Sequence, residues 1–156
     1  MHLLFVCTGN TCRSPMAEAI ARRLAGERRF EDLTVASAGT SAWDGAPASD
    51  GALLVALEQG LDLNAHRAQV LSRELVEAAD LILVMSPHHR ERAVVLGGEG
   101  RAHLLTDFAS RSTDGRPVQD PFGGELDLYR QTFDELSREI TLVIERLAAE
   151  RRSESA

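Results

Sequence analysis

The segment FVCTGNTCRSPMAEAI, residues 5–20, joins a short apolar run to a helical pattern through a polar loop. The run Leu3–Cys7 is typical of a buried parallel strand, because it is short and continuously apolar. Ser14-Pro15 predicts the start of a helix that ends near Arg29, since serine caps free backbone amides and proline fits the first helical turn. The segment therefore predicts a strand, a tight loop and a helix, in that order.

The rest of the chain alternates between strand and helix patterns. Further strands are expected at Leu33–Ala38, Asp80–Met85 and Ala102–Leu105, and further helices at Ala52–Gln59, from Ser72 through Ala79, from Pro87 to just before Gly97, and from Glu125 to about Arg151. Asp107–Pro121 is expected to be a long loop. This alternation predicts an α/β fold in which helices cover both faces of a parallel sheet. Ligands of such folds bind beyond the carboxyl ends of the strands, which is where Cys7 is expected.

The bulk composition narrows the class of protein. A length of 156 residues suits one domain, expected to span residues 1–156, and a net charge of −7 argues against broad nucleic-acid binding. No apolar stretch approaches the roughly 20 residues of a membrane span, and the run at residues 2–6 is too short for a signal peptide. We therefore expect a cytoplasmic protein that does not bind membranes, and a monomer. All 17 basic residues are arginine, which excludes a lysine-containing nucleotide-binding loop.

The loop between the first strand and helix has the length and composition of a phosphate site. Cys7 and Arg13 enclose Thr8, Gly9, Asn10, Thr11 and Cys12. Successive backbone N–H groups of such a loop can converge on one anion, and the following helix adds its positive end. Arg13 adds a planar fork that can hold two phosphate oxygens. The loop is therefore predicted to bind a phosphoryl group.

Cys7 is the candidate nucleophile of this loop. Thiols at helix N-termini or beside arginine have a lowered pKa, so we expect Cys7 to be a thiolate near neutral pH, steadied by the Ser14 hydroxyl. A basic leaving group then needs a proton donor, and Asp120, held extended before Pro121, is the candidate. The alternatives are a small buried cysteine at a strand end and a plain turn aspartate.

The stretch Val6–Pro15, with Asp120-Pro121, resembles the low-molecular-weight protein tyrosine phosphatase family, and the resemblance spans nearly the whole chain. It implies a three-layer fold with a four-stranded parallel sheet in the order 2-1-3-4. It also implies that Cys7 forms a cysteinyl-phosphate, that Arg13 clamps the phosphate, and that Asp120 is first a general acid and then a base for water. No metal or organic cofactor is implied.

Further positions match residues that hold the loop in that family. Asn10, Ser14, Ser37 and His66 are implied to form a hydrogen-bonded network, with Ser37 in the matching segment Ser37-Ala38-Gly39-Thr40. The alternatives are a plain strand-end residue for Ser37 and a core histidine for His66. The family often has arginine where this chain has Gln69. His88 and His89 are expected to be exposed at the start of a helix, and the alternative is that they border the pocket.

Two local features favour phosphoarginine over phosphotyrosine in protein substrates. Typical tyrosine-directed members carry a bulky aliphatic residue where Thr11 stands, and two aromatic residues after Asp-Pro, whereas here Phe122 is followed by two glycines. The loop, this segment and Asp127–Thr132 resemble the bacterial protein-arginine phosphatases of the family. A polar Thr11 suits a guanidinium, and a single Phe122 would leave a pocket for a long, thin side chain. Trp43 is expected either on the opposite rim of this pocket or as an ordinary packing residue.

Other interpretations remain open at this point. The first alternative is that the enzyme acts on phosphotyrosine rather than phosphoarginine. A thioredoxin-coupled arsenate reductase would need further cysteines, and positions 80–100 contain none. A catalytically inactive phosphate-binding scaffold is the third class. Cys12 could form a reversible disulfide with Cys7 that protects the nucleophile from irreversible oxidation, or it could be a buried loop residue.

Overall fold

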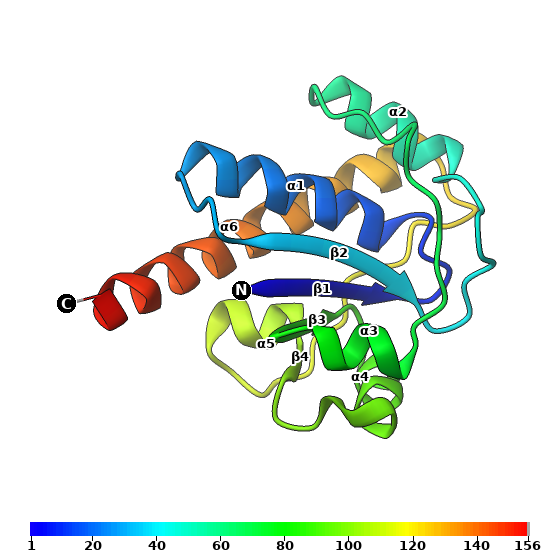
Figure 1. The fold of residues 1–156 in the computed structure, drawn as a ribbon. Coiled ribbons are helices and arrows are strands. Elements are labelled where there is room, and N and C mark those ends of the chain that lie inside the picture. The colour runs from blue at the N-terminus through cyan, green and yellow to red at the C-terminus, as the bar shows by residue number, and fades with distance from the viewer. Residues whose placement is uncertain (156) are drawn as a thin grey trace.

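The computed structural model describes residues 1–155 (Figure 1); Ala156, the last residue of the expected domain, lies outside the described residues. The strands are β1 (His2–Cys7), β2 (Thr34–Gly39), β3 (Leu81–Val84) and β4 (Ala102–Leu104). The helices are α1 (Arg13–Glu27), α2 (Asp50–Glu58), α3 (Arg73–Ala78), α4 (Pro87–Ala93), the π-helical segment η1 (Val94–Gly98), α5 (Leu105–Ser110) and α6 (Leu126–Ser155).

The strands form one parallel sheet in the order β2-β1-β3-β4, which confirms the predicted order. The register pairs Cys7 with Gly39 and Val6 with Val84, so the carboxyl ends of β1, β2 and β3 share one edge. The short loop that leaves this edge after Cys7 leads directly into α1. The sheet therefore places the predicted phosphate loop where open α/β folds bind their ligands.

Helices cover both faces of the sheet, as predicted (Figure 1). Leu3 and Phe5 of β1 point to the face that packs against α1 and α6, because successive strand residues alternate between faces. Leu4 and Val6 point to the opposite face, where Val76 of α3 closes a second apolar cluster. Both faces are thus buried, which explains why β1 is an uninterrupted apolar run.

Several predicted element boundaries differ from those of the structure, and two of the differences have a clear physical cause. The expected loop Asp107–Pro121 begins inside α5, because the aromatic ring of Phe108 is buried and stacks under the guanidinium of Arg146 from α6, a tertiary contact that local sequence does not show. Helix α2 begins at Asp50 rather than Ala52, because the Ser49 hydroxyl caps it by accepting from the Ala52 N–H at 3.3 Å.

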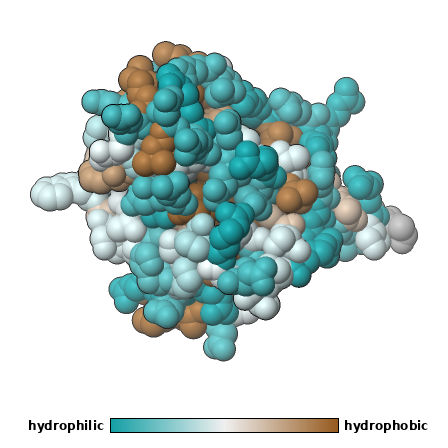
Figure 2. All heavy atoms as spheres, turned by 180° about the vertical axis from the view of Figure 1, so that it is seen from behind, coloured by the Kyte–Doolittle hydropathy of each residue, from teal (hydrophilic) through white to brown (hydrophobic). Residues whose placement is uncertain are grey.

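The surface seen from behind is mostly hydrophilic (Figure 2). Hydrophobic side chains on that face are scattered among polar ones, and those of Leu54 and Leu57 on α2 are among the exposed apolar residues of the molecule. Within residues 1–155, none of the helices combines the length and apolar composition needed to cross a bilayer.

Candidate active site

The loop after β1 forms one wall of a cavity of about 180 Å³. Its lining residues are Cys7, Thr8, Gly9, Thr11, Cys12, Arg13, Asp120 and Phe122. The three predicted catalytic residues, Cys7, Arg13 and Asp120, therefore meet at one hollow although they come from opposite ends of the chain. Of the predicted specificity residues, Thr11 and Phe122 line this cavity.

Asn10 is a buried residue of the loop that connects it to its surroundings by hydrogen bonds. It is fully buried, and its φ of 56° lies in the left-handed region, which turns the chain sharply at this point. Its side-chain N–H groups donate to Ser14 Oγ (2.7 Å) and Ser37 Oγ (3.0 Å). His66 Nε2 lies 2.7 Å from the Asn10 carbonyl oxygen. The structure thus brings together Asn10, Ser14, Ser37 and His66, and the catalytic value of the network stays a prediction.

A carboxylate fixes the direction of this hydrogen-bond chain. Glu18 can only accept when ionised, so the Ser37 hydroxyl donates to Glu18 Oε1 at 2.9 Å and accepts from Asn10. Asn10 then donates to Ser14 Oγ, which leaves the Ser14 proton for Cys7 Sγ, 2.9 Å away. This series of hydrogen bonds therefore ends with the Ser14 hydroxyl donating to the sulfur of Cys7, the candidate nucleophile. The sequence analysis missed Glu18, since nothing in its helical pattern distinguishes it from a surface residue.

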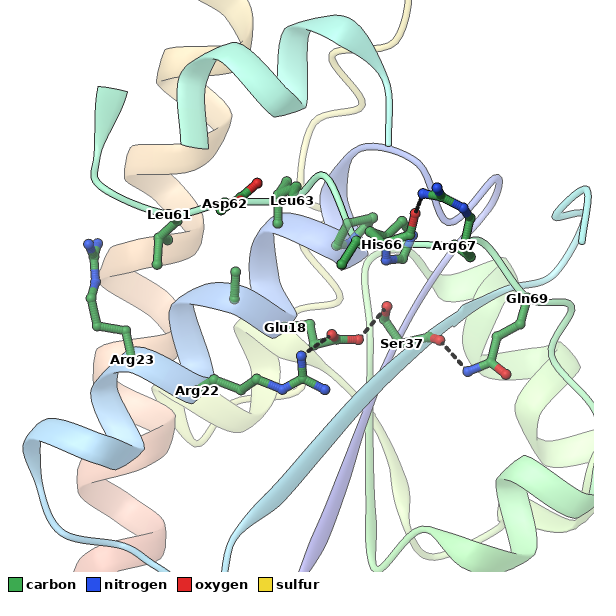
Figure 3. A pocket seen from close by; sticks show the side chains of 13 residues that line it. Glu18, Arg22, Arg23, Ser37, Leu61, Asp62, Leu63, His66, Arg67 and Gln69 are labelled. Atoms are coloured by element: carbon green, nitrogen blue, oxygen red, sulfur yellow. Dashed lines mark hydrogen bonds and ion pairs between the residues drawn. The ribbon is translucent and has the colours of Figure 1, made fainter. Parts of the chain in front are cut away.

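The outer end of the network opens on a pocket of about 640 Å³ between α1 and residues 61–69 (Figure 3). Glu18 lies there between Ser37 and Arg22, whose Nη1 is 2.7 Å from Glu18 Oε2. Gln69, which replaces the arginine common in the family, donates its side chain to the Ser37 carbonyl at 2.9 Å and its backbone N–H to Asn10 Oδ1 at 3.0 Å. Gln69 therefore supports the loop through these two hydrogen bonds, although it is not the arginine that the family often has.

Burial raises the pKa of the Cys7 thiol, and this effect is larger than those that oppose it. Hydrogen bonds from the Ser14 hydroxyl and backbone N–H, the charge of Arg13 and the backbone N–H of Asn10 lower the same pKa. The predicted lowering of this pKa was wrong, because the sequence revealed the stabilising donors but not how deeply the thiol is buried at the base of the cavity. The thiolate fraction at neutral pH consequently depends on those donors.

Ser14→Ala should raise the pKa of Cys7 further, because it removes the hydroxyl that donates to the sulfur. A hydrogen bond to a charged group contributes about 1.5–3 kcal/mol, so the pH profile of Cys7 alkylation should move up by about one to two pH units. Rates of iodoacetamide labelling, read at Cys7 by mass spectrometry between neutral and alkaline pH, measure this shift. Exposed Ser41→Ala is the matched control, and an unchanged profile for Ser14→Ala would show that the hydroxyl does not act on the sulfur.

Arg13 connects the loop to the segment that carries Asp120. Its side chain is buried, and Nη1 donates to the Val118 carbonyl at 2.8 Å. Nη2 lies 3.7 Å from Asp120 Oδ2, and Asp120 Oδ1 accepts from the Phe122 N–H at 3.1 Å. The Asp120 side chain is half exposed. The carboxyl group is therefore held over the cavity mouth, where a leaving group would emerge.

Gly39 allows β2 to approach the loop closely. A Cβ at this position would lie 2.4 Å from the Thr8 carbonyl oxygen and 2.8 Å from the Asn10 nitrogen, too close for any side chain. The next residues, Thr40 and Ser41, donate their N–H groups to the carbonyls of Cys7 and Thr8, each at 2.9 Å. The similarity of Ser37–Thr40 to the family thus has a physical explanation, because this segment supports the loop through backbone contacts.

Cys12 is buried, and its sulfur lies 3.2 Å from Ser49 Oγ and 3.6 Å from Tyr129 Oη. Both cysteines are free thiols, and a disulfide between Cys7 and Cys12 stays a prediction.

Phe122 is 72% exposed at the cavity, whereas Trp43 is 84% exposed and is not among the residues that line it. The structure therefore does not place Trp43 on the rim opposite Phe122.

His89 was expected at the surface, but it is fully buried. It lies one helical turn into α4, and its Nε2 is 2.8 Å from Thr8 Oγ1 in the phosphate loop. Ser86, at the N-cap of the same helix, lies 3.5 Å from Arg13 Nη1. The start of α4 thus contacts the loop at Thr8 and at Arg13. The pattern Ser-Pro-His-His gave no sign of which histidine turns inward.

Among residues 1–155, no group of three or more histidine, cysteine or acidic side chains is arranged to hold a metal ion. The chemistry available at the cavity comes from a thiol, a guanidinium and a carboxyl group, with the backbone N–H groups of Asn10 and Ser14 directed at the thiol. Such a set can bind a phosphoryl group, attack it and protonate what leaves.

Comparisons with known proteins agree with this geometry. A family model described as low molecular weight phosphotyrosine protein phosphatase matches residues 2–153. The protein-arginine-phosphatase of Bacillus subtilis is 39% identical over 97% of this chain and 100% of its own length. The low molecular weight protein-tyrosine-phosphatase PtpB of Staphylococcus haemolyticus is 39% identical over 87% of this chain and 92% of its own.

Among solved structures, a mutant of the YwlE arginine phosphatase with a phosphorylated active-site serine superposes with a TM-score of 0.90 and 38% identity, covering 97% of this chain and 99% of that one. Agreement of fold and sequence over nearly the full length makes this protein a cysteine-dependent protein phosphatase. Within that class, the chain belongs to the low molecular weight phosphotyrosine protein phosphatase family.

Proposed function

We propose that this enzyme hydrolyses phosphoarginine residues in proteins through a cysteinyl-phosphate intermediate. The observation that carries the proposal is the make-up of the cavity: the polar Thr11 and the single ring of Phe122 stand beside Cys7, Arg13 and Asp120. The full-length similarity to a protein named protein-arginine-phosphatase supports it.

The reaction follows from the position of each group. Loop N–H groups and Arg13 bind the phosphoryl oxygens and stabilise the charge that they carry in the transition state. Cys7 Sγ attacks phosphorus as the phosphorus–nitrogen bond breaks, and Asp120 gives its proton to the departing guanidine nitrogen. Water, deprotonated by the Asp120 carboxylate, then attacks the cysteinyl-phosphate and releases inorganic phosphate and the thiolate. Ser14 donates to the sulfur as it leaves.

The rim favours a guanidinium over a phenol. A phosphoguanidinium is planar and rich in N–H donors, so it can donate to the Thr11 hydroxyl oxygen and to the carbonyl oxygen of the half-exposed Asp120 carboxyl group, which still carries its proton. A phenol ring offers neither donor. One exposed ring at Phe122 leaves room for a thin, extended side chain.

Phosphotyrosine is the competing substrate. The similarity to a tyrosine-directed relative is as high in identity, 39%, although it covers less of the chain, and Phe122 could stack on a phenol ring. Purified protein should turn over a phosphoarginine peptide with a higher kcat/KM than the phosphotyrosine peptide of the same sequence. Cys7→Ser is the blank for both. Faster turnover of phosphotyrosine would reverse the assignment.

Thr11→Ile should shift the preference toward phosphotyrosine, because it replaces a hydroxyl that accepts from a guanidinium with an apolar surface. A lost hydrogen bond to a charged group lowers kcat/KM on phosphoarginine by about tenfold or more, whereas phosphotyrosine turnover should hold or rise. Steady-state kinetics on the two matched peptides give the ratio. Thr40→Val, outside the cavity lining, is the control variant. A ratio that does not move in Thr11→Ile would remove this residue from the account of specificity.

A further inference from the structure

His89 is a buried histidine that contacts the phosphate loop through one ring nitrogen only. Its Nε2 lies 2.8 Å from Thr8 Oγ1, and Thr8 lines the catalytic cavity. Its Nδ1 is buried without a hydrogen-bond partner among the described residues. A buried side chain with one unsatisfied nitrogen is unusual, so the position calls for a physical reason.

The ring is neutral under ordinary conditions. Burial, the neighbouring His88 and the charge of Arg13 lower the pKa of His89 to about 3. A neutral imidazole carries one N–H and one lone pair, which leaves two tautomers. With the proton on Nδ1, a buried N–H would have no acceptor, and orphaned buried N–H groups are rare in folded proteins. With the proton on Nε2, the unsatisfied atom is only a lone pair, and Nε2–H donates to the Thr8 oxygen.

The second arrangement decides where the Thr8 proton points. An oxygen that accepts from His89 keeps its own hydrogen for another acceptor. Thr8 borders the hollow in which a phosphoryl group would lie beside Cys7 and Arg13. A phosphoryl oxygen is the strongest acceptor that this hollow would receive, and hydrogen bonds to ionised acceptors are stronger than neutral ones.

We propose that His89 is a positioning residue, which holds the Thr8 hydroxyl so that it donates to the bound phosphoryl group. Thr8 thereby adds a side-chain donor to the ring of backbone amides, and His89 acts only through Thr8. The proposal rests on the phosphatase activity proposed above, but not on the choice between phosphoarginine and phosphotyrosine, because both substrates present the same phosphoryl oxygens.

Binding of inorganic phosphate, measured by calorimetry, tests the proposal together with kcat/KM on an aryl phosphate. Thr8→Val removes the hydroxyl at nearly constant shape and should weaken phosphate binding by about tenfold, whereas Thr8→Ser should stay close to wild type. His89→Leu should weaken binding by a similar factor. His89→Gln should restore most of it, because the glutamine amide can place a donor near the position of Nε2.

The double variant Thr8→Val/His89→Leu separates positioning from simple support of the fold. If His89 acts through Thr8, the double variant binds phosphate no more weakly than Thr8→Val alone. Additive losses would overturn the proposal, and so would wild-type phosphate binding by Thr8→Val. The exposed neighbour variant His88→Leu is the matched control, with thermal unfolding recorded for each protein. If His89→Leu does not fold, His89→Gln and the Thr8 pair still decide the outcome. Failure of the proposed function would appear separately, as phosphate binding without turnover in the wild type.

Discussion

Arg13→Lys should lower kcat/KM on an aryl phosphate by about a thousandfold or more, the range found when a phosphate-clamping arginine is lost. A lysine has one point charge and cannot hold two phosphoryl oxygens while still donating to the Val118 carbonyl, the contact that Arg13 makes at 2.8 Å. The loss should appear in both phosphate affinity and kcat, because the guanidinium contacts the substrate and also anchors the segment of Asp120.

The matched control for this change is Arg116→Lys. Arg116 lies in the same long segment as Asp120, but its guanidinium is half exposed and pairs with Glu135 and Glu139 on α6, away from the cavity. Its kcat/KM should remain near that of the wild type. An Arg13→Lys enzyme that kept most of the wild-type rate would contradict the role of the bidentate fork.

Asp120→Asn should lower kcat/KM, which reports the step in which the leaving group departs, by about a hundredfold to ten-thousandfold on substrates whose leaving group is basic, because no proton donor then remains over the cavity mouth. The loss should be much smaller for a nitrophenyl phosphate, whose leaving group needs no proton. Asparagine keeps an oxygen for the Phe122 N–H, so the turn itself is preserved. Rates on a series of aryl phosphates with increasingly basic phenols measure the difference.

Asp114→Asn serves as the control for charge, since Asp114 is exposed on the same segment. Its rates should follow those of the wild type across the whole series. If Asp120→Asn lowered kcat/KM by the same factor on every leaving group, Asp120 would act in positioning or binding rather than in proton donation to the leaving group.

The fold was predictable where local pattern decides it. Residues 3–7 are apolar without a break because β1 is covered on both faces, and Pro15 lies in the first turn of α1 as expected. The expected cap at Ser14 was wrong, because Cys12 is at the N-cap and the Ser14 hydroxyl faces Cys7 and Asn10 instead. The boundary near Asp107 was missed because it depends on Phe108 packing against α6, a contact between segments far apart in the sequence. A single sequence therefore predicts the elements that depend on local residue pattern, but not the boundaries that depend on contacts between distant segments.

The same division applies to the site. Cys7, Arg13 and Asp120 could be named because their residue types suit phosphoryl transfer, but the effect of burial on the pKa of Cys7 exists only in the folded molecule. Glu18 and His89 were missed for a related reason. Each contacts one neighbour, Ser37 or Thr8, and these contacts form only when the helices and the loop pack together.

The exposure of Trp43 has a practical consequence for anyone following the unfolding of this enzyme. It is the single tryptophan of the sequence, and with 84% of its surface already in water its indole has nearly the solvation of an unfolded chain. The wavelength of its fluorescence emission is therefore a poor measure of whether the protein is folded. Far-ultraviolet circular dichroism, to which a terminal helix of 30 residues contributes strongly, is the better choice for every variant described above.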